Sequence, residues 1–180
     1  MGDRSPDPVD ESQEYQRHLL GLLGDDDPAH VQAAMPGEWH TMVDLAVANL
    51  HEVPAHGEWS VFGCLAHVVD AEIVMSGRYR WIVAHDEPPL LGYDQDLWVQ
   101  RLHADPGSEP VADLLASFAA LRQANVAMWR RSSDAERARV GLHGERGPES
   151  YDLSFRMIAG HDRFHLRQAR ETLDAVTSHG

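Results

Sequence analysis

The sequence predicts an all-α protein, a four-helix bundle with an additional short N-terminal helix. Several long segments carry apolar residues at the three- and four-residue spacing of helices. Proline and glycine clusters separate these segments. No stretch of useful length alternates apolar and polar residues as a half-buried strand would. Long helices packed on one another are therefore the expected architecture.

The first 27 residues are expected to form an N-terminal arm and a short helix. The arm is rich in proline and aspartate, and the helix is indicated by Tyr15, Leu19, Leu20 and Leu23. Gly24 and the acidic run that follows it should end this helix. We therefore divide the chain into residues 1–27, the arm and short helix, and residues 28–180, the bundle domain.

The first bundle segment extends from Pro28 to Leu50. Its apolar positions are Val31, Met35, Met42, Leu45 and Leu50. Because Pro36-Gly37 interrupts the pattern, only the second half, from Trp39 onwards, is expected to be helical.

The second bundle segment has the densest apolar content of the chain. Ser60 can cap its N-terminus by accepting a hydrogen bond from a free amide of the first turn. Apolar residues then continue on more than one side of the helix as far as about His85. This pattern predicts a central helix of the bundle.

The remainder of the chain predicts two more long helices. Pro88-Pro89 ends the second helix, a short connecting helix is expected at 94–103, and a turn is expected at 105–107. The third long helix should begin at Pro110 and end near Arg131. Residues 141–148 hold three glycines and a proline and are expected to be a loop, and the last helix should cover 151–176.

The charge of the chain disfavours two classes of partner. Its 180 residues include 15 Lys and Arg against 29 Asp and Glu, a formal net charge of −14. An acidic surface repels phosphate backbones and anionic lipid headgroups unless a local basic cluster overcomes it. The densest basic stretch, Arg130 to Arg139, is interrupted by acids. We therefore expect no binding to nucleic acid and none to membranes.

Cysteine content and the N-terminal residues bear on localisation. The single cysteine, Cys64, cannot form an intramolecular disulfide. Residues 1–11 carry acids and prolines where a secretory signal needs a basic start and an apolar run. No run of about 18 apolar residues, the length of a membrane-spanning helix, occurs. A cytoplasmic protein is expected.

Histidine is unusually frequent, with 12 residues. His161 and His165 are four apart in the last predicted helix, so both imidazoles share one face and can bind one cation. Chance alone would produce about 0.8 pairs at this spacing, so an exposed pair is an open alternative. The pair shares its face with Met157 and Ile158, which favours an inward orientation.

His67 is a third candidate ligand. It lies among apolar residues in the middle of the second predicted helix. The alternative is a core histidine that is hydrogen-bonded to a backbone group or a carboxylate.

Three stretches of the chain carry a family resemblance. They are Gly57-Glu58-Trp59-Ser60, Leu65-Ala66-His67-Val68-Val69-Asp70-Ala71-Glu72, and Ile158-Ala159-Gly160-His161-Asp162-Arg163-Phe164-His165-Leu166-Arg167-Gln168. Together they resemble the Trp-Ser, first-histidine and His-x-x-x-His signatures of the DinB/YfiT-like metal-dependent superfamily. The resemblance extends from about residue 30 to 176, and the arm and short helix of residues 1–27 lie outside it.

The resemblance implies a DinB-like four-helix bundle in which His67, His161 and His165 bind a divalent metal, commonly zinc or nickel. Three nitrogen ligands leave positions open for water or substrate. The resemblance also implies a metal-dependent thiol S-transferase, or a hydrolase, that uses a low-molecular-weight thiol and a small-molecule substrate. The alternative is a non-catalytic metal-binding stress or structural protein. A homodimer through bundle helices is compatible with either.

Other residues are weaker candidates for the site. Asp70 and Asp162 are near ligand histidines in sequence and would orient an imidazole or act as a base, although a solvated helix carboxylate is the favoured interpretation of both. His143, in a predicted loop, is a candidate to approach the open side of the metal. Arg78 and Asn125 are candidates to bind a thiol's carboxylate or sugar, the alternative being ordinary polar groups of the bundle. Cys64 is expected to behave as a small hydrophobic residue.

Overall fold

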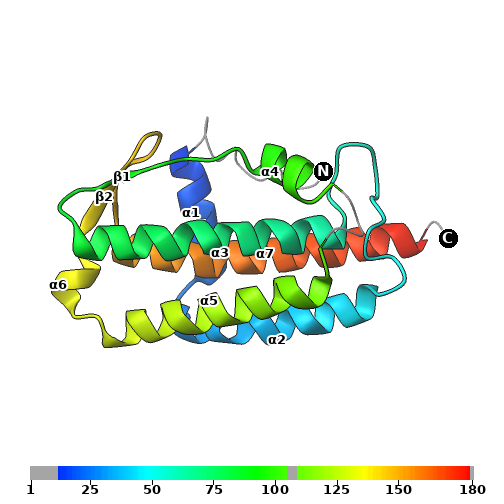
Figure 1. Cartoon of the computed structure of the whole chain (residues 1–180), viewed down its shortest axis with the longest axis horizontal. Coiled ribbons are helices and arrows are strands. Elements are labelled where there is room, and N and C mark those ends of the chain that lie inside the picture. The colour runs from blue at the N-terminus through cyan, green and yellow to red at the C-terminus, as the bar shows by residue number, and fades with distance from the viewer. Residues whose placement is uncertain (1–11, 105–108, 179–180) are drawn as a thin grey trace.

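Four long helices lie side by side in the computed structural model, which describes residues 12–104 and 109–178 (Figure 1). They are α2 (Pro28–Ala46), α3 (Val61–Ala84), α5 (Val111–Arg131) and α7 (Tyr151–Ser178). Helix α2 packs on α5 and α7, and α3 packs on the same two helices, so the order around the bundle is α2, α5, α3, α7. The predicted fold class is confirmed.

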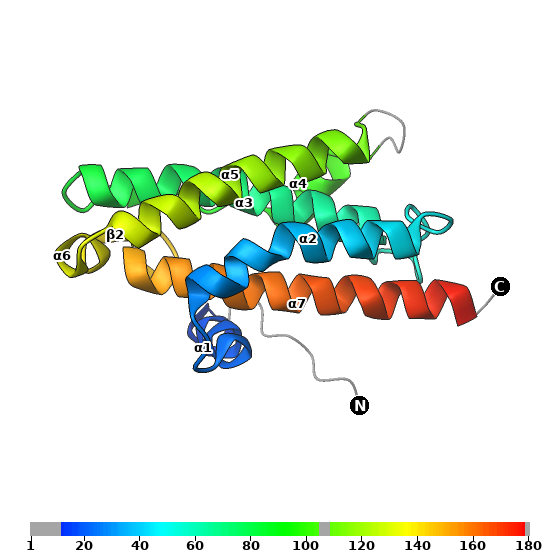
Figure 2. The same ribbon diagram turned by 90° about the horizontal axis from the view of Figure 1, so that it is seen from below.

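The predicted short N-terminal helix is α1 (Ser12–Leu23), which crosses α7 on the outside of the bundle (Figure 2). Leu19 and Leu23 are buried in this contact. Gly24 has a φ of 61°, the left-handed conformation in which helices commonly end. Arg163 of α7 donates to the backbone oxygens of Leu22 and Leu23 at 2.8 and 3.1 Å, which fixes the end of α1 to α7. The predicted arm before Ser12 lies outside the described residues.

Helix α2 begins earlier than the sequence predicts and ends at Ala46, before the predicted Leu50. It is helical from Pro28, with Asp27 as its N-cap, and it continues through Pro36 to Ala46. A proline inside a helix removes one backbone hydrogen bond and costs about 3 kcal/mol. Buried residues on both sides of Pro36, including Val31, Met35 and Trp39, offset that cost by packing in the core. The helix bends along its length instead of breaking (Figure 2).

Helix α3 begins as predicted. The Ser60 side chain accepts a hydrogen bond from the Gly63 amide at 3.1 Å, and most of the helix is buried. The predicted connecting helix is α4 (Gln95–Leu102), which packs on α3 and has Asp94 as its N-cap. The predicted turn at 105–107 lies outside the described residues.

The loop predicted at 141–148 is wrong: this segment forms most of a hairpin. After the short α6 (Asp134–Arg137), strand β2 (Val140–His143) pairs antiparallel with β3 (Gly147–Ser150), and β1 (Pro89–Leu90) pairs parallel with β2. Strands of four residues or fewer are too short to show alternation in the sequence. Gly141 has a structural role, because a Cβ there would lie 2.8 Å from the Leu90 side chain.

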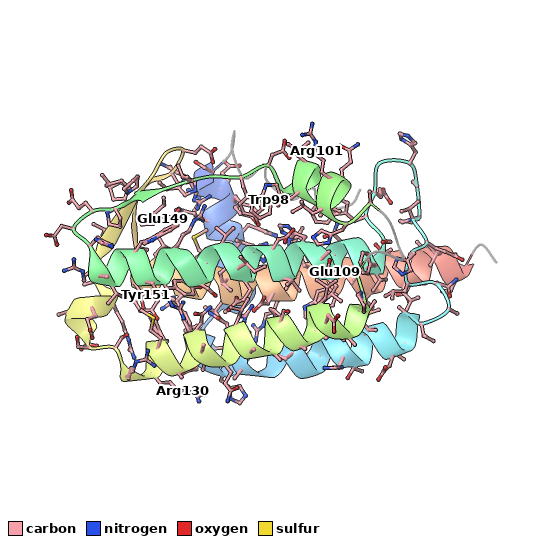
Figure 3. The ribbon with its side chains drawn as sticks, in the orientation of Figure 1. Trp98, Arg101, Glu109, Arg130, Glu149 and Tyr151 are labelled. Atoms are coloured by element: carbon pink, nitrogen blue, oxygen red, sulfur yellow. The ribbon has the colours of Figure 1, made fainter. Side chains whose placement is uncertain are left out.

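Side chains fill the space between the helices (Figure 3). At the end of the bundle near α6, Trp129 of α5 stacks on Phe155 of α7 with ring centroids 4.2 Å apart, and Tyr151 packs edge-on against both rings. None of the helices within residues 12–104 and 109–178 has the length and hydropathy to cross a membrane.

Candidate metal centre

Three buried histidines from two bundle helices meet in the interior. His67 projects from α3, and His161 and His165 project from successive turns of α7. One ligand nitrogen from each ring lies within 4.8 Å of the other two. The Nε2 atoms of His67 and His161, which are 94 residues apart in the chain, are 3.0 Å apart. The structure therefore brings together the three histidines that the sequence analysis singled out.

The three imidazoles are held in the neutral form. Burial lowers the pKa of His67 and His161 well below the usual value, and the neighbouring His165 lowers both further. Burial also lowers the pKa of His165 to about 4, with the hydrogen bond to Gln168 opposing the shift. A neutral imidazole keeps one lone pair for a cation.

Two neighbours orient the cluster. The Nδ1 atom of His165 lies 2.8 Å from the Gln168 side-chain oxygen. Because that oxygen only accepts, Nδ1 carries the hydrogen and the lone pair of His165 is on Nε2. The Trp59 ring is stacked on that of His165, with ring centroids 5.9 Å apart, and its centroid lies 4.9 Å from that of His67. Trp59 therefore places an apolar surface beside the two imidazoles.

The donor set fits a divalent transition metal. Two nitrogens that share one cation at about 2.0–2.1 Å are separated by about 3.0–3.4 Å, and the His67–His161 separation agrees with this. No Cys, Asp or Glu of the described residues joins the three histidines within the same 4.8 Å. Three imidazoles without a fourth protein ligand are typical of a site that keeps a position open.

A cavity of about 460 Å³ opens onto this cluster. His67 and His161 form part of its wall, together with Arg78 of α3 and His143 of β2. Tyr15 and Leu19 line it from α1, and Asp94 and Asp96 line it at the start of α4. His143 is buried in β2, so the hairpin that the sequence did not reveal places this candidate at the same cavity as the histidine cluster. The short N-terminal helix is likewise a wall of the cavity, which no local sequence signal indicates.

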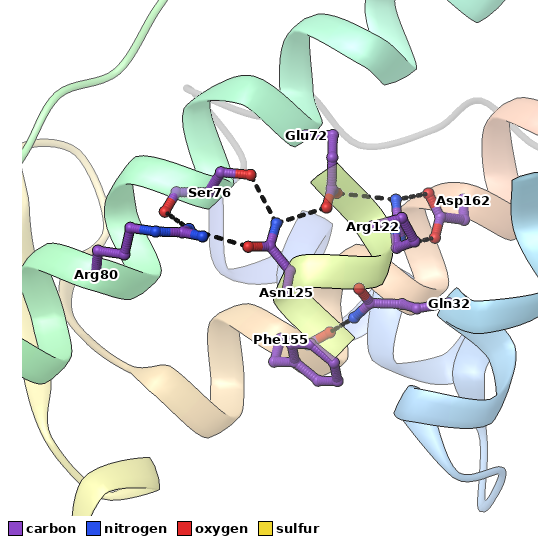
Figure 4. Close-up of polar contacts among 8 residues, drawn as sticks. All are labelled: Gln32, Glu72, Ser76, Arg80, Arg122, Asn125, Phe155 and Asp162. Carbon is purple, nitrogen blue, oxygen red and sulfur yellow. Dashed lines mark hydrogen bonds and ion pairs between the residues drawn. The ribbon is translucent and has the colours of Figure 1, made fainter. Parts of the chain in front are cut away.

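Asp162 is not a solvated carboxylate, contrary to the favoured interpretation. It is fully buried and accepts two hydrogen bonds from Arg122, at 2.5 and 3.0 Å (Figure 4). Arg122 also pairs with Glu72 at 3.0 Å. Burial raises the pKa of Asp162 to about 6, and Arg122 opposes this shift. Asp162 therefore orients Arg122 and makes no bond to the imidazole of His161 that the structure shows.

Asn125 belongs to the same buried network. Its amide nitrogen donates to Glu72 and to Ser76, both at 2.6 Å, and its oxygen accepts from Arg80 at 3.0 Å (Figure 4). The residues that form the cavity wall do not include Asn125. Its hydrogen-bonding groups are engaged within the bundle, in line with the alternative interpretation. The feature of the sequence that could have revealed this network was Glu72, a charged residue in an otherwise mainly apolar stretch of α3.

Asp70 is also buried, so the solvated interpretation is wrong here too. Its carboxylate lies 3.1 Å from Nε2 of His103, and Nδ1 of that ring lies 2.9 Å from Glu109, a residue labelled in Figure 3. Asp70 therefore orients a histidine, but it is His103 near the end of α4 and not His67. This contact ties the end of α4 to α3.

Cys64 is fully buried in α3, and burial raises the pKa of its thiol to about 12. A thiol with this pKa is neutral at physiological pH and a poor nucleophile. The prediction that it behaves as a small hydrophobic residue agrees with its packing in the core.

Comparison with known proteins gives a family and a fold. The family model of the DinB superfamily matches residues 13–169. This match includes most of α1, which the sequence resemblance had left out. No curated protein matches the chain. Among solved structures, YfiT from Bacillus subtilis, described as a probable metal-dependent hydrolase with an unusual four-helix bundle topology, is similar with a TM-score of 0.74. The two chains are 16% identical over 98% of this chain and 95% of YfiT.

Proposed function

The chain belongs to the DinB superfamily, and from this membership and the three-histidine centre we propose that it is a metal-dependent thiol S-transferase. In this proposal His67, His161 and His165 hold one divalent ion, zinc or nickel. The co-substrate is a low-molecular-weight thiol, and the acceptor is a small electrophile bound in the adjoining cavity.

One observation carries the proposal. Three buried neutral imidazoles converge beside a cavity, and no fourth ligating side chain of the described residues closes the group. A structural metal site is closed by four protein ligands, whereas a reactive site leaves room for water or substrate. This arrangement favours a reaction over the alternative of a purely structural metal-binding protein.

The residues around the cluster have distinct tasks in this proposal. A bound divalent ion would lower the pKa of a coordinated thiol or water and so supply a nucleophile near neutral pH. Gln168 holds the lone pair of His165 on Nε2. In the transfer, the thiol sulfur bonds to the electrophilic carbon, the leaving group departs with the bonding electrons, and the thiol proton goes to solvent.

Hydrolysis is the second candidate, with water in place of the thiol. The description of YfiT as a probable metal-dependent hydrolase favours it. The same three histidines would serve both reactions, so only the nucleophile distinguishes them.

The first test is metal content, measured by elemental mass spectrometry on protein purified without an affinity tag. We expect about one divalent ion per chain in the wild type and in His40→Ala, since His40 is exposed on α2 away from the cluster. His161→Ala should lose the ion because only two of the three imidazole ligands remain. Wild-type protein that stays empty after metal addition would refute the proposed site.

The second test separates the two reactions. Metal-loaded protein is incubated with a panel of small electrophiles, with and without small thiols, and the products are identified by mass spectrometry. Thioether products that require both thiol and metal support the transferase. Hydrolysed products formed without thiol support the hydrolase, and no metal-dependent product across a broad panel would count against both.

A further inference from the structure

Arg78 is a buried guanidinium that pairs with no carboxylate of residues 12–104 and 109–178. Its side chain lines the cavity and the residue is 6% exposed. Among the described residues it forms no ion pair: its contacts are the backbone oxygen of Leu91, the sulfur of Met75 at 3.6 Å, and Nε2 of His143 at 3.4 Å. A guanidinium has five N–H donors, and these contacts supply one oxygen acceptor. Burial and the positive charge of Arg146 lower the pKa of Arg78, and the negative charge of Glu149 opposes this shift.

The two nitrogens of His143 cannot both accept hydrogen bonds. The Glu145 backbone N–H donates to Nδ1 at 3.3 Å, while Arg78 approaches Nε2 at 3.4 Å. A neutral imidazole has one lone pair, so when Nδ1 accepts from Glu145, Nε2 carries a hydrogen. Arg78 and His143 then present N–H donors to each other at the cavity wall. An acceptor placed between them would satisfy both.

We propose that Arg78 and His143 form a subsite for a carboxylate of the small molecule that reacts at the three-histidine centre. This inference rests on the proposed function, because it assigns one end of the same cavity to the ligand's anionic group. Arg78 and His143 are positioning residues here: they hold the ligand while its reactive end lies at His67 and His161.

The charge of the subsite favours a monoanion. The other cavity arginine, Arg146, pairs with Glu149, which also accepts from Ser154 at 3.3 Å. Arg78 is therefore the one described arginine of the wall that forms no ion pair, although the carboxylates of Asp94, Asp96 and Glu145 also line the cavity. A carboxylate balances the charge of Arg78 and matches the planar fork of a guanidinium, whereas a phosphate dianion would leave a buried negative charge.

The position of Arg78 on α3 suits a ligand that reaches the cluster. It is 11 residues after His67, which is three helical turns, so the two side chains project from the same face. Their Cα atoms are separated by about 16 Å along the helix axis, and both side chains line the cavity. Because the arginine side chain extends several ångströms from its backbone, a ligand that joins the subsite to the cluster spans less than about 16 Å.

The test measures ligand affinity by isothermal titration calorimetry. The probes are ω-mercaptoalkanoates of increasing chain length, the corresponding mercaptoalcohols, and fatty acids and alcohols that lack the thiol. The proteins are wild type, Arg78→Met, and Arg156→Met as a control that removes one exposed arginine of α7. Each protein is titrated as purified and after metal removal, and circular dichroism verifies that the variants are folded.

We expect the carboxylate of the best chain length to bind wild type and Arg156→Met about 10- to 100-fold more tightly than its alcohol counterpart. In Arg78→Met this ratio should fall to about one, with metal content unchanged. If the mercaptoalkanoates bind more tightly than their alcohols, the carboxylate belongs to the thiol co-substrate. If instead fatty acids bind more tightly than their alcohols while a neutral thiol is also bound, the carboxylate belongs to the acceptor.

An unchanged ratio in Arg78→Met, or no preference for carboxylates in the wild type, would overturn the subsite. Failure of the proposed function looks different, because the protein would then hold no metal or would form no metal-dependent product. The comparison of fatty acids with alcohols in metal-free protein still decides the subsite in that case.

Discussion

Replacing Gly160 with alanine should force α1 away from α7. Gly160 precedes His161, and a Cβ at this position would lie 1.9 Å from the backbone oxygen of Leu19 and 2.6 Å from its carbonyl carbon. Contacts of a Cβ below 3.0 Å essentially do not occur in proteins. The colliding atoms belong to backbone, so no side-chain rotation relieves the clash. The helices must separate by the difference between 3.0 and 1.9 Å, about 1.1 Å.

The cost of this separation follows from the two leucines that α1 buries. Leu19 and Leu23 are 2% and 1% exposed, and full burial of a leucine contributes about 1.5–3 kcal/mol. A gap of about 1 Å removes roughly a quarter to a half of the contact energy. For two leucines the expected loss is about 1–3 kcal/mol.

The matched control is Gly21→Ala, within α1, where a Cβ meets nothing within 4 Å. Both substitutions gain the helix propensity of alanine, about 1 kcal/mol, so the difference between the two isolates the clash. Urea unfolding should show Gly160→Ala to be less stable than Gly21→Ala by about 1–3 kcal/mol. Hydrogen exchange should be faster in residues 12–23 of Gly160→Ala. Two variants of equal stability, or equal exchange in α1, would refute the reasoning.

Two further predictions concern the surroundings of the histidine cluster. Gln168→Met removes the acceptor that orients His165, so metal affinity, measured by competition with a chelator, should fall about 10- to 100-fold. Gln123→Met, on the exposed face of α5, should leave it unchanged, and equal affinities in both variants would contradict the role of Gln168. Arg122→Met leaves Glu72 and Asp162 buried without their cation and should lower the free energy of unfolding by about 3–5 kcal/mol. Arg156→Met should change it by less than about 0.5 kcal/mol, and a similar value for Arg122→Met would show that the ion pairs contribute little.

Much of the secondary structure was predictable because it depends on residues close in the chain. Ser60 caps α3 through an amide three residues away, and Gly24 ends α1 in the left-handed conformation. Predictions from periodicity were wrong where packing between residues distant in the chain outweighed local conformational preference. Pro36 should interrupt α2, but core residues on both sides of it hold the helix together. The hairpin of β2 and β3 was missed because strands of four residues carry too short a pattern.

The chemistry of the centre was predictable only in part. The spacing of His161 and His165 fixes them on one face of any helix that contains them. Whether that face is buried, and what lies opposite, depends on the whole bundle. Asp70 and Asp162 illustrate the limit: each follows a histidine closely in sequence, yet one pairs with His103 and the other with Arg122.

The sequence by itself therefore determined the helical class, most helix boundaries, the net acidic charge, and the identity of the three histidines. Each of these depends on composition or on residues within a few positions of one another. Only the tertiary structure decided that His67 lies 3.0 Å from His161, that α1 forms a wall of the cavity, and that Arg78 faces His143 there. These contacts depend on how the helices are aligned along one another, which is set by the combined packing of the core rather than by any single segment.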